Sequence, residues 1–347
     1  MPDISTIDKN FFIDNSIDEE NTVFYDAKDE VFSLHGVFHE NGCYRRLPEE
    51  LGMRVNEGIK ILHTHTAGGR LRFMTDSPYI VLNATFINLT KATHMPFTAS
   101  IGFDIYRDNI YHSTFVPALG VTDEGFTQLK RCDGKMHTYE INFPLYSGVR
   151  ELEIGIKKGS EIKKAADYKI KTPVVYYGSS ITQGGCASRP GTSYQAIIHR
   201  SIDADYINLG FSGSCLAEDA MLDYISNLDM SVFVYDYDHN APTPEFLEKT
   251  HEPFYKKLRE RRPDLPIIMV SAPTLTGGMW TVRREHIKSN YEKGVAAGDK
   301  NLYFVDGYEI FEGNYDCTVD GCHPTDLGFY FMAKHIGAKV KEVIEKL

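Results

Sequence analysis

The pattern of apolar runs changes at Pro173, and this change constrains the fold more than any other feature of the chain. Before Pro173, short runs rich in β-branched and aromatic residues follow one another, with no convincing amphipathic helix between them. After it, short apolar runs alternate with helical patterns. The sequence therefore predicts two domains of different class, residues 1–168 and 169–347, connected through the charged stretch 157–173.

The first domain is predicted to be a β-sandwich of jelly-roll type, because many short strands must pack sheet on sheet to bury their inner faces. The expected strands span residues 31–38, 59–66, 70–75, 79–88, 99–108, 109–117, 137–143 and 150–156. Within the second of these, His63 and His65 have a spacing seen in metal sites. No nearby carboxylate or third histidine completes such a site, so we expect both to be solvent-facing strand residues and predict no metal.

The second domain is predicted to be a three-layer α/β domain. Its apolar runs, at 174–177, 205–209, 231–236, 266–272 and 301–306, are typical of parallel strands buried on both faces. Helical patterns lie between them, and a last helix from Leu327 to Ile344 ends the chain. In such domains the ligand binds at the carboxyl ends of the strands.

Polar residues suited to acyl transfer follow several of these strands. Ser180 follows the first strand, Gly213 the second and Asn240 the third, while Asp320 and His323 lie between the fifth strand and the last helix. We expect Ser180 to be the nucleophile and His323 its base, with Asp320 orienting the imidazole. The backbone N–H groups of Ser180 and Gly213 and the Asn240 amide are the expected oxyanion donors.

Each of these residues also has a simpler interpretation. A serine after a strand is more often a turn residue or a helix cap than a nucleophile. Asp320 and His323 could equally introduce the last helix. The convergence of four separate segments at one sheet edge favours the catalytic interpretation.

Four short strings resemble the conserved blocks of the SGNH, or GDSL-like, hydrolases. They are GSSIT (178–182), NLGFSG (208–213), DHN (238–240) and DGCH (320–323). The longer string GSSITQGGCASRPG (178–191) is similar to a branch whose N-terminal sandwich carries a Gly-x-Asp-Leu-Tyr signature, here Gly102-Phe103-Asp104-Ile105-Tyr106. The resemblance therefore covers both predicted domains.

The resemblance implies a flavodoxin-like sheet, serine esterase chemistry without a metal or other cofactor, and substrates that are often acetylated sugars. It also implies the roles given above to Ser180, Gly213, Asn240, Asp320 and His323. Two departures stand out. Ser179 replaces the Asp that usually precedes the nucleophile, and Asp238-His239-Asn240-Ala241 replaces Gly-x-Asn-Asp, so that the third block depends on Asn240 alone.

Candidate substrate contacts surround these blocks. Arg189 follows the serine block, and Trp280 and Arg283 lie in the segment after the fourth strand, where a tryptophan face and arginine donors would suit a sugar. Asp238 and His239 could contact the substrate or order their loop. A packed Trp280 with the arginines in surface ion pairs is an equally good interpretation.

Charge and apolar patterning exclude several kinds of partner. Lys and Arg total 37 against 48 Asp and Glu, a net charge of −11, so a nucleic acid backbone would be repelled. No apolar stretch approaches the length of a membrane span, and no secretion signal begins the sequence. We therefore expect no nucleic acid or membrane partner and a cytoplasmic location, or secretion if a leader has been removed.

The six cysteines are too sparse for a disulfide framework and are expected to be free thiols. Cys317 and Cys322 flank Asp320, so a disulfide or a redox-sensitive thiol there is the alternative.

The leading hypothesis is a metal-independent serine esterase that removes a small acyl group, in particular acetyl, from a carbohydrate through an acyl-enzyme on Ser180. The second domain would then be the catalytic domain, and the sandwich would hold the sugar or form a wall of the cleft. A lipase or thioesterase, or an acyltransferase, would use the same residues. A carbohydrate-binding protein with a vestigial hydrolase domain is the non-enzymatic alternative. The sequence leaves open the sugar, the hydroxyl, the acyl length and the oligomeric state, a homo-oligomer included.

Overall fold

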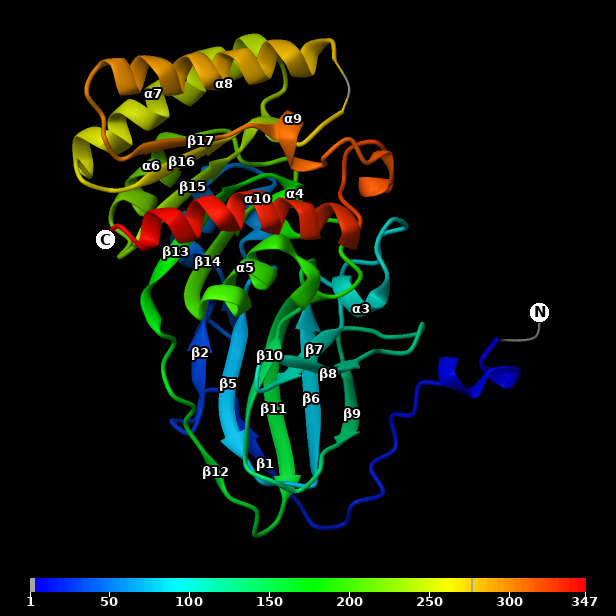
Figure 1. Ribbon diagram of the computed structural model, residues 1–347. Coiled ribbons are helices and arrows are strands. Elements are labelled where there is room, and N and C mark those ends of the chain that lie inside the picture. The colour runs from blue at the N-terminus through cyan, green and yellow to red at the C-terminus, as the bar shows by residue number, and fades with distance from the viewer. Residues whose placement is uncertain (1–3, 276) are drawn as a thin grey trace.

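The computed structural model describes residues 4–275 and 277–347. Figure 1 shows a sheet-rich domain next to an α/β domain, with the N-terminal segment extending away from both. The chain passes from the first domain to the second between β12 (Ile162–Lys163) and β13 (Ile170–Gly178).

Two antiparallel sheets form the first domain. One has the order β1 (Thr22–Asp26), β11 (Gly148–Lys157), β6 (Tyr79–Ile87), β9 (Phe126–Arg131). The other has the order β12, β5 (Arg70–Thr75), β10 (His137–Asn142), β7 (Phe103–Arg107), β8 (Ile110–Phe115), with β2 (Ser33–His35) also paired to β5. A hairpin, β3 (Phe38–Glu40) and β4 (Cys43–Arg45), completes the domain's strands in the described part of the chain.

The two sheets share one apolar core. Leu71 and Phe73 of β5 pack in it with Ile80 and Leu82 of β6, so the alternate residues of strands from both sheets point inward. From β5 to β11 the chain changes sheet at every connection except the one between β7 and β8. The predicted sandwich of jelly-roll type is confirmed.

The prediction of a strand over residues 59–66 is wrong. This segment forms helix α2 (Ile59–Leu62) and a turn, preceded by helix α1 (Glu49–Val55), and α3 (Phe97–Ser100) is a further short helix of this domain. Ile59 packs beneath the parallel sheet of the second domain, a tertiary contact that overrides the strand propensity of its neighbours. His63 and His65 are buried, 2% and 3% exposed, so their predicted solvent-facing position is also wrong.

The second domain has a five-stranded parallel sheet in the order β14 (Ala204–Gly210), β13, β15 (Val232–Asp236), β16 (Ile267–Val270), β17 (Leu302–Val305). Its helices are α4 (Ser180–Gln183), α5 (Tyr194–Ile202), α6 (Asp219–Ser226), α7 (Pro244–Arg261), α8 (Met279–Ala296), α9 (Gly307–Ile310) and α10 (Asp326–Ile344).

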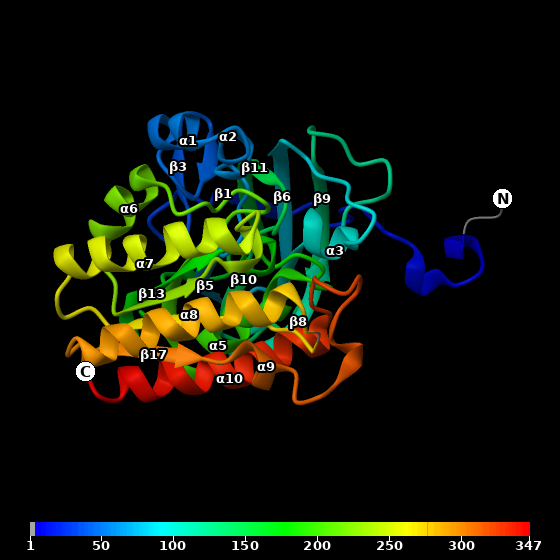
Figure 2. The ribbon, with the colours of Figure 1, turned by 90° about the horizontal axis from the view of Figure 1, so that it is seen from above.

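Helices cover both faces of this sheet. Val174 and Tyr176 of β13 face α5 and α10, whereas Val175 and Tyr177 face α6, α7 and α8, as the two-residue period of a strand requires. Figure 2 shows α10 along one side of the domain and α7 along the other. The predicted three-layer α/β arrangement is confirmed.

The sandwich covers the free edge of the parallel sheet, where β14 has a neighbour on one side only. Nη2 of Arg70 donates to the Tyr206 carbonyl at 3.0 Å, and Nη1 of Arg46 donates to the carbonyl of Asn208 at 3.2 Å and to that of Gly210. These carbonyls are two residues apart and point to the same side of the strand. Two buried arginines thus satisfy an edge that would otherwise need another strand or water.

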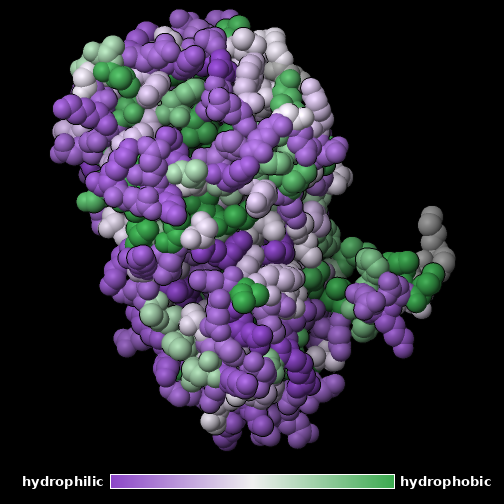
Figure 3. All heavy atoms as spheres, viewed as in Figure 1, coloured by the Kyte–Doolittle hydropathy of each residue, from purple (hydrophilic) through white to green (hydrophobic). Residues whose placement is uncertain are grey.

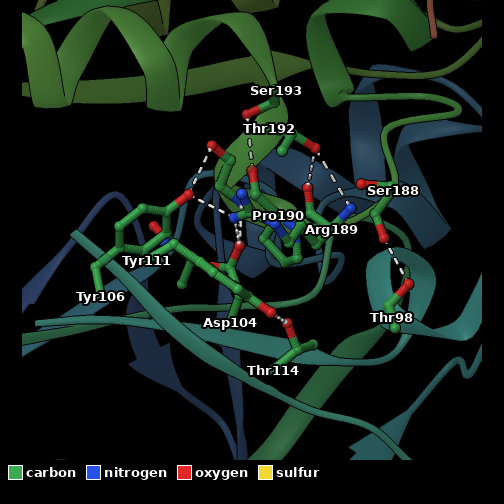
Figure 4. Close-up of polar contacts among 12 residues, drawn as sticks. Thr98, Asp104, Tyr106, Tyr111, Thr114, Ser188, Arg189, Pro190, Thr192 and Ser193 are labelled. Atoms are coloured by element: carbon green, nitrogen blue, oxygen red, sulfur yellow. Dashed lines mark hydrogen bonds and ion pairs between the residues drawn. The ribbon is translucent and has the colours of Figure 1, made fainter. Parts of the chain in front are cut away.

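The signature segment Gly102–Tyr106 forms a second joint between the domains (Figure 4). The buried carboxylate of Asp104 accepts hydrogen bonds, each 2.8 Å long, from Nη1 of Arg189, from the Gly191 N–H and from Nδ2 of Asn142. The guanidinium of Arg189 also donates to the Tyr106 hydroxyl, and it lies 4.1 Å above the ring of Tyr111. Arg189 therefore connects the domains, and a substrate contact by its remaining exposed part stays a prediction.

The surface is mostly polar on the face seen in Figure 3, whereas the projecting N-terminal segment carries hydrophobic residues. Ile4, Ile7, Phe11 and Phe12 of that segment are each more than half exposed. No helix in the described ranges is both long and apolar enough to span a bilayer.

Replacing Asp104 with alanine should lower the free energy of unfolding by about 3 kcal/mol, because Arg189, Asn142 and the Gly191 N–H would lose their buried acceptor. Urea unfolding of both proteins measures the difference. The matched control is Asp223→Ala, which removes an exposed ion pair with Arg261 and should cost less than about 1 kcal/mol. Equal losses in the two variants would contradict the role given to Asp104.

Candidate active site

Ser180, His323 and Asp320 form a continuous chain of hydrogen bonds at the carboxyl edge of the parallel sheet. Ser180 is the first residue of α4, directly after β13, and its Oγ lies 2.9 Å from Nε2 of His323. Nδ1 of the same ring lies 2.7 Å from Oδ2 of Asp320. The Ser180 side chain stays reachable, since the residue is 9% exposed.

A tight turn holds Asp320 and His323 in this geometry. Oδ1 of Asp320 accepts the backbone N–H groups of Cys322 at 3.0 Å and of His323 at 2.7 Å, which leaves Oδ2 for the imidazole. Burial raises the pKa of the Asp320 carboxyl, but the hydrogen bonds from His323 and these N–H groups outweigh it and bring the pKa to about 2. The ionised carboxylate keeps the proton on Nδ1, so Nε2 can accept the Ser180 proton.

The segments that carry the expected oxyanion donors are tied to one another. The Phe211 N–H donates to the Gly178 carbonyl at 2.9 Å, and Nδ2 of Asn240 donates to the Phe211 carbonyl at 2.8 Å. Gly213 has φ +63°, a left-handed conformation that glycine adopts without strain. The structure therefore brings together the three segments from which donors to an oxyanion near Ser180 were predicted.

Ser179, at the position where the family usually has Asp, is the N-cap of α4. Its side chain accepts the Ile181 N–H at 3.1 Å and caps α4. Serine and aspartate are both good N-caps, so the substitution preserves the start of the helix that carries Ser180.

Asp238 and Arg283 support the Asn240 loop from inside, which for Asp238 is the loop-ordering alternative. Both are buried, and Nη1 of Arg283 donates to the Asp238 carbonyl at 2.8 Å and to its carboxylate at 3.2 Å. Oδ2 of Asp238 also accepts the Ala272 N–H at 2.9 Å, and Arg283 Nη2 donates to the Ala241 carbonyl at 2.6 Å. The Asp238 carboxylate and the Arg283 guanidinium, which have opposite charges, thus bind each other and are not free to bind a sugar.

His239 and Trp280 form a half-buried aromatic pair beside the site, with ring centroids 4.8 Å apart. Burial, together with the charges of Arg283 and His323, lowers the pKa of His239 to about 3, so this ring is neutral at physiological pH. Cζ of Arg283 lies 5.3 Å from the centroid of the Trp280 ring. Substrate contact by His239 and Trp280 stays a prediction.

The first domain also contacts the serine helix, through residues that the sequence interpretation did not identify. The Tyr146 hydroxyl donates to the Ser180 carbonyl at 3.2 Å, and Nε2 of Gln183 donates to the Leu145 carbonyl at 3.1 Å. Gln183 lies one helical turn after Ser180 in the serine block, a spacing that signals proximity. Nothing in the sequence around Tyr146 signals its contact.

The described residues include no group of three or more His, Cys, Asp or Glu side chains that could hold a metal ion. All six cysteines, each within the described ranges, are free. Burial, with the charge of nearby Asp320, raises the pKa of the Cys322 thiol to about 11. Burial also raises the pKa of the Cys317 thiol.

The fold is that of an esterase-type hydrolase of the SGNH class. Residues 171–341 match the model of the GDSL-like Lipase/Acylhydrolase family, and residues 22–162 match that of the N-terminus of Esterase_SGNH_hydro-type. The chain belongs to this family, in the branch with the additional N-terminal domain. The resemblance found in the sequence is confirmed for both domains.

Solved structures agree with this assignment. The chain is 28% identical to a protein described as a GDSL-like lipase from Bacteroides ovatus, with a TM-score of 0.83 over 94% of this chain and 98% of that one. A salicylyl-acyltransferase, SsfX3, from a tetracycline biosynthetic pathway has 18% identity and a TM-score of 0.78 over 93% and 98% of the two chains.

A family two carbohydrate esterase from Cellvibrio japonicus has 12% identity and a TM-score of 0.64, again over 93% of this chain and 98% of the other. At these low identities the acyltransferase and the carbohydrate esterase show a shared fold alone. The search of curated proteins found no match.

A buried carboxyl that takes no part in the hydrogen-bonded chain lies at the end of β15. Oδ2 of Asp236 accepts from the Tyr194 hydroxyl at 2.9 Å and from Oγ1 of Thr182 at 3.1 Å. Burial raises the pKa of Asp236, these two hydrogen bonds lower it, and the charge of the nearby Asp238 raises it. The net result is a pKa of about 7.

This raised pKa predicts a stability that falls as the pH rises. Between about pH 4 and 7 the unfolded chain has lost the Asp236 proton while the folded protein keeps it, so unfolding is favoured by about 1.4 kcal/mol for each pH unit. Asp236→Asn keeps a neutral acceptor for Tyr194 and should remove this decline, which makes the variant more stable than wild type at pH 8.

Chemical unfolding at pH 4, 6 and 8 measures the effect. Asp229→Asn, at an exposed carboxylate, is the control and should follow wild type at each pH. A decline of the same slope in Asp236→Asn would show that Asp236 does not cause it.

Proposed function

We propose that the protein is a metal-independent serine esterase that removes a small acyl group, in particular acetyl, from a carbohydrate hydroxyl. The observation that carries the proposal is the hydrogen-bonded chain from Ser180 through His323 to Asp320. Its distances suit transfer of the serine proton to the imidazole, which an acyl-transfer reaction needs.

The reaction would proceed in two steps on Ser180. Oγ of Ser180 attacks the ester carbonyl carbon while Nε2 of His323 takes the hydroxyl proton, and the new oxyanion accepts hydrogen bonds from the N–H groups of Ser180 and Gly213 and from the Asn240 amide. The bond to the sugar oxygen then breaks, and His323 gives its proton to that oxygen. Water, deprotonated by His323, cleaves the acyl-enzyme and releases acetate and free Ser180.

Two findings support a carbohydrate as the alcohol. The fold is shared with a family two carbohydrate esterase. The half-buried Trp280, paired with the neutral ring of His239 next to Asn240 in the chain, offers an aromatic ring on which a sugar could pack.

An acyltransferase is the second candidate, favoured by the fold shared with the salicylyl-acyltransferase over almost the whole chain. Its acyl-enzyme would form in the same way, and an alcohol other than water would accept the acyl group. Supplying a small alcohol with an activated ester and measuring the yield of transferred product separates the two. A lipase or thioesterase would instead prefer octanoyl over acetyl nitrophenyl esters.

Ser180→Ala should abolish deacetylation, because the variant cannot form the acyl-enzyme, with a loss of about 10⁴-fold or more in turnover. Mass spectrometry of acetylated mannan, xylan and chitin-derived oligosaccharides after incubation measures the loss of acetyl groups. Ser201→Ala, which changes an exposed serine of α5 whose hydroxyl donates to the Ile198 carbonyl, is the matched control and should retain turnover. Equal acetyl loss with wild type and Ser180→Ala would refute the proposed nucleophile.

Asp320→Asn should lower kcat by roughly 10²–10⁴-fold and leave the fold intact, since an amide facing Nδ1 would favour the wrong imidazole tautomer. Because the pKa of Asp320 is about 2, its carboxylate stays ionised down to about pH 3. The wild-type acid limb should therefore show one protonation above that pH. A pH–rate profile with two protonations there would contradict the assignment.

A further inference from the structure

The loop after β14, residues 210–213, is held by groups from outside its own segment. We call it the oxyanion loop, because it supplies the Gly213 N–H. The Gly210 carbonyl accepts from Arg46, the Phe211 carbonyl from Asn240, and the Ser212 N–H donates to Oε1 of Gln183 at 2.9 Å. The 210–211 and 211–212 peptides are thus held by side chains from other segments. The carbonyl of the 212–213 peptide, which carries the Gly213 N–H, accepts from Oγ of Ser214 at 3.0 Å.

Arg46 belongs to the N-terminal domain and is 2% exposed. Its guanidinium donates only to carbonyls: those of His65 at 2.6 Å and Leu62 at 2.8 Å in its own domain, and those of Asn208 and Gly210 across the joint. Its Cζ lies 4.4 Å above the ring of Phe211.

Arg46 and Arg70 both donate to the edge of β14, but only Arg70 has a carboxylate that balances its charge. Arg70 forms an ion pair with Asp205, whereas no carboxylate in the described chain lies within 4 Å of the Arg46 guanidinium. An unpaired buried cation is costly, so its place beside the oxyanion loop needs a reason other than stability.

Gln183 also connects the oxyanion loop to the first domain, through the nitrogen of its side-chain amide. Nε2 of Gln183 donates to the Leu145 carbonyl at 3.1 Å and to Nδ1 of His65 at 3.2 Å. Burial, with the charges of Arg46 and His63, lowers the pKa of His65 to about 3, so its Nδ1 is free to accept. The His65 carbonyl accepts from Arg46. Arg46, His65, Leu145 and Gln183 therefore form one hydrogen-bonded network from the sandwich to the Ser212 N–H.

Donors to an oxyanion are effective only when they are already oriented before the charge develops. A backbone N–H has no side chain of its own to orient it, so its direction depends on the peptides before it. The unpaired charge of Arg46 also favours negative charge near it in a poorly polarisable interior.

On the basis of the serine chemistry proposed above, we propose that Arg46 and Gln183 are positioning residues that orient the oxyanion loop, and that the N-terminal domain is thereby a working part of the catalytic site.

The test compares Arg46→Met and Arg46→Lys with Arg70→Met as the matched control, since Arg70 is an equally buried arginine that also donates to β14, but to the Tyr206 carbonyl instead of the loop. With 4-nitrophenyl acetate, Arg46→Met should lower kcat by about 10²-fold with KM changed less than about threefold, the pattern of a lost transition-state interaction. Arg46→Lys should be intermediate, because one ammonium group cannot reach all four carbonyls. Arg70→Met should lower the melting temperature but keep kcat within about threefold.

Gln183→Met gives an independent measurement that does not depend on Arg46→Met folding. It keeps the side-chain length but removes the acceptor of the Ser212 N–H, and it should lower kcat by about tenfold or more with KM little changed. Circular dichroism and thermal unfolding establish the folded fraction of each variant. Folded Arg46→Met and Gln183→Met variants that keep kcat within threefold of wild type would overturn the inference.

Labelling of Ser180 by a fluorophosphonate separates this inference from the proposed substrate. The serine oxygen bonds to phosphorus and fluoride leaves, a step that needs oxyanion donors but no acetyl or sugar group. Wild type that labels fast but hydrolyses no acetyl ester would refute the substrate class, while slower labelling of Arg46→Met and Gln183→Met would still support the positioning role. Equal labelling rates in wild type and both variants would refute that role, whatever the substrate.

Discussion

The two-domain structure depends on how the free edge of the parallel sheet is closed. β14 is an edge strand, and its outward carbonyls at Tyr206, Asn208 and Gly210 accept hydrogen bonds from arginines of the sandwich. At Gly68, with φ +83°, an added Cβ would lie 2.7 Å from the Asn208 side chain, so the two backbones approach too closely for any other residue. The sandwich thus supplies hydrogen-bond donors to the edge carbonyls, as a further strand would, and the edge cannot pair with another chain.

This closure puts the first domain against the machinery of the second. The turn that holds Leu62 and His65 anchors Arg46, and Leu145 and Tyr146 contact the helix that begins at Ser180. A second joint through Asp104 fixes the segment that follows this helix. The serine helix is therefore fixed on the side facing the sandwich by the same contacts that join the domains.

How far the sequence predicts such a structure depends on the range of the interactions involved. The strand–helix alternation after Pro173 and the residues at the strand ends are local, so the sheet and the convergence of Ser180 and His323 on one edge could be predicted. The helix at 59–62 could not, because Ile59 packs against the sheet of the other domain. The partners of Arg189 and Arg283 could not be predicted for the same reason: each has a buried carboxylate partner that lies far away in the sequence.

Backbone donors set a further limit on what a motif can specify. Among the predicted oxyanion donors only the Asn240 amide is a side chain, and it donates to the Phe211 carbonyl, so even this group also orients the loop. A motif can supply Gly213, which tolerates φ +63°, but it cannot aim the N–H of that residue. The aim depends on the peptides of Gly210 and Ser212, and their partners come from another domain and another helix. Conserved strings of this kind therefore mark where the chemistry occurs, while the precision of the site depends on residues outside them.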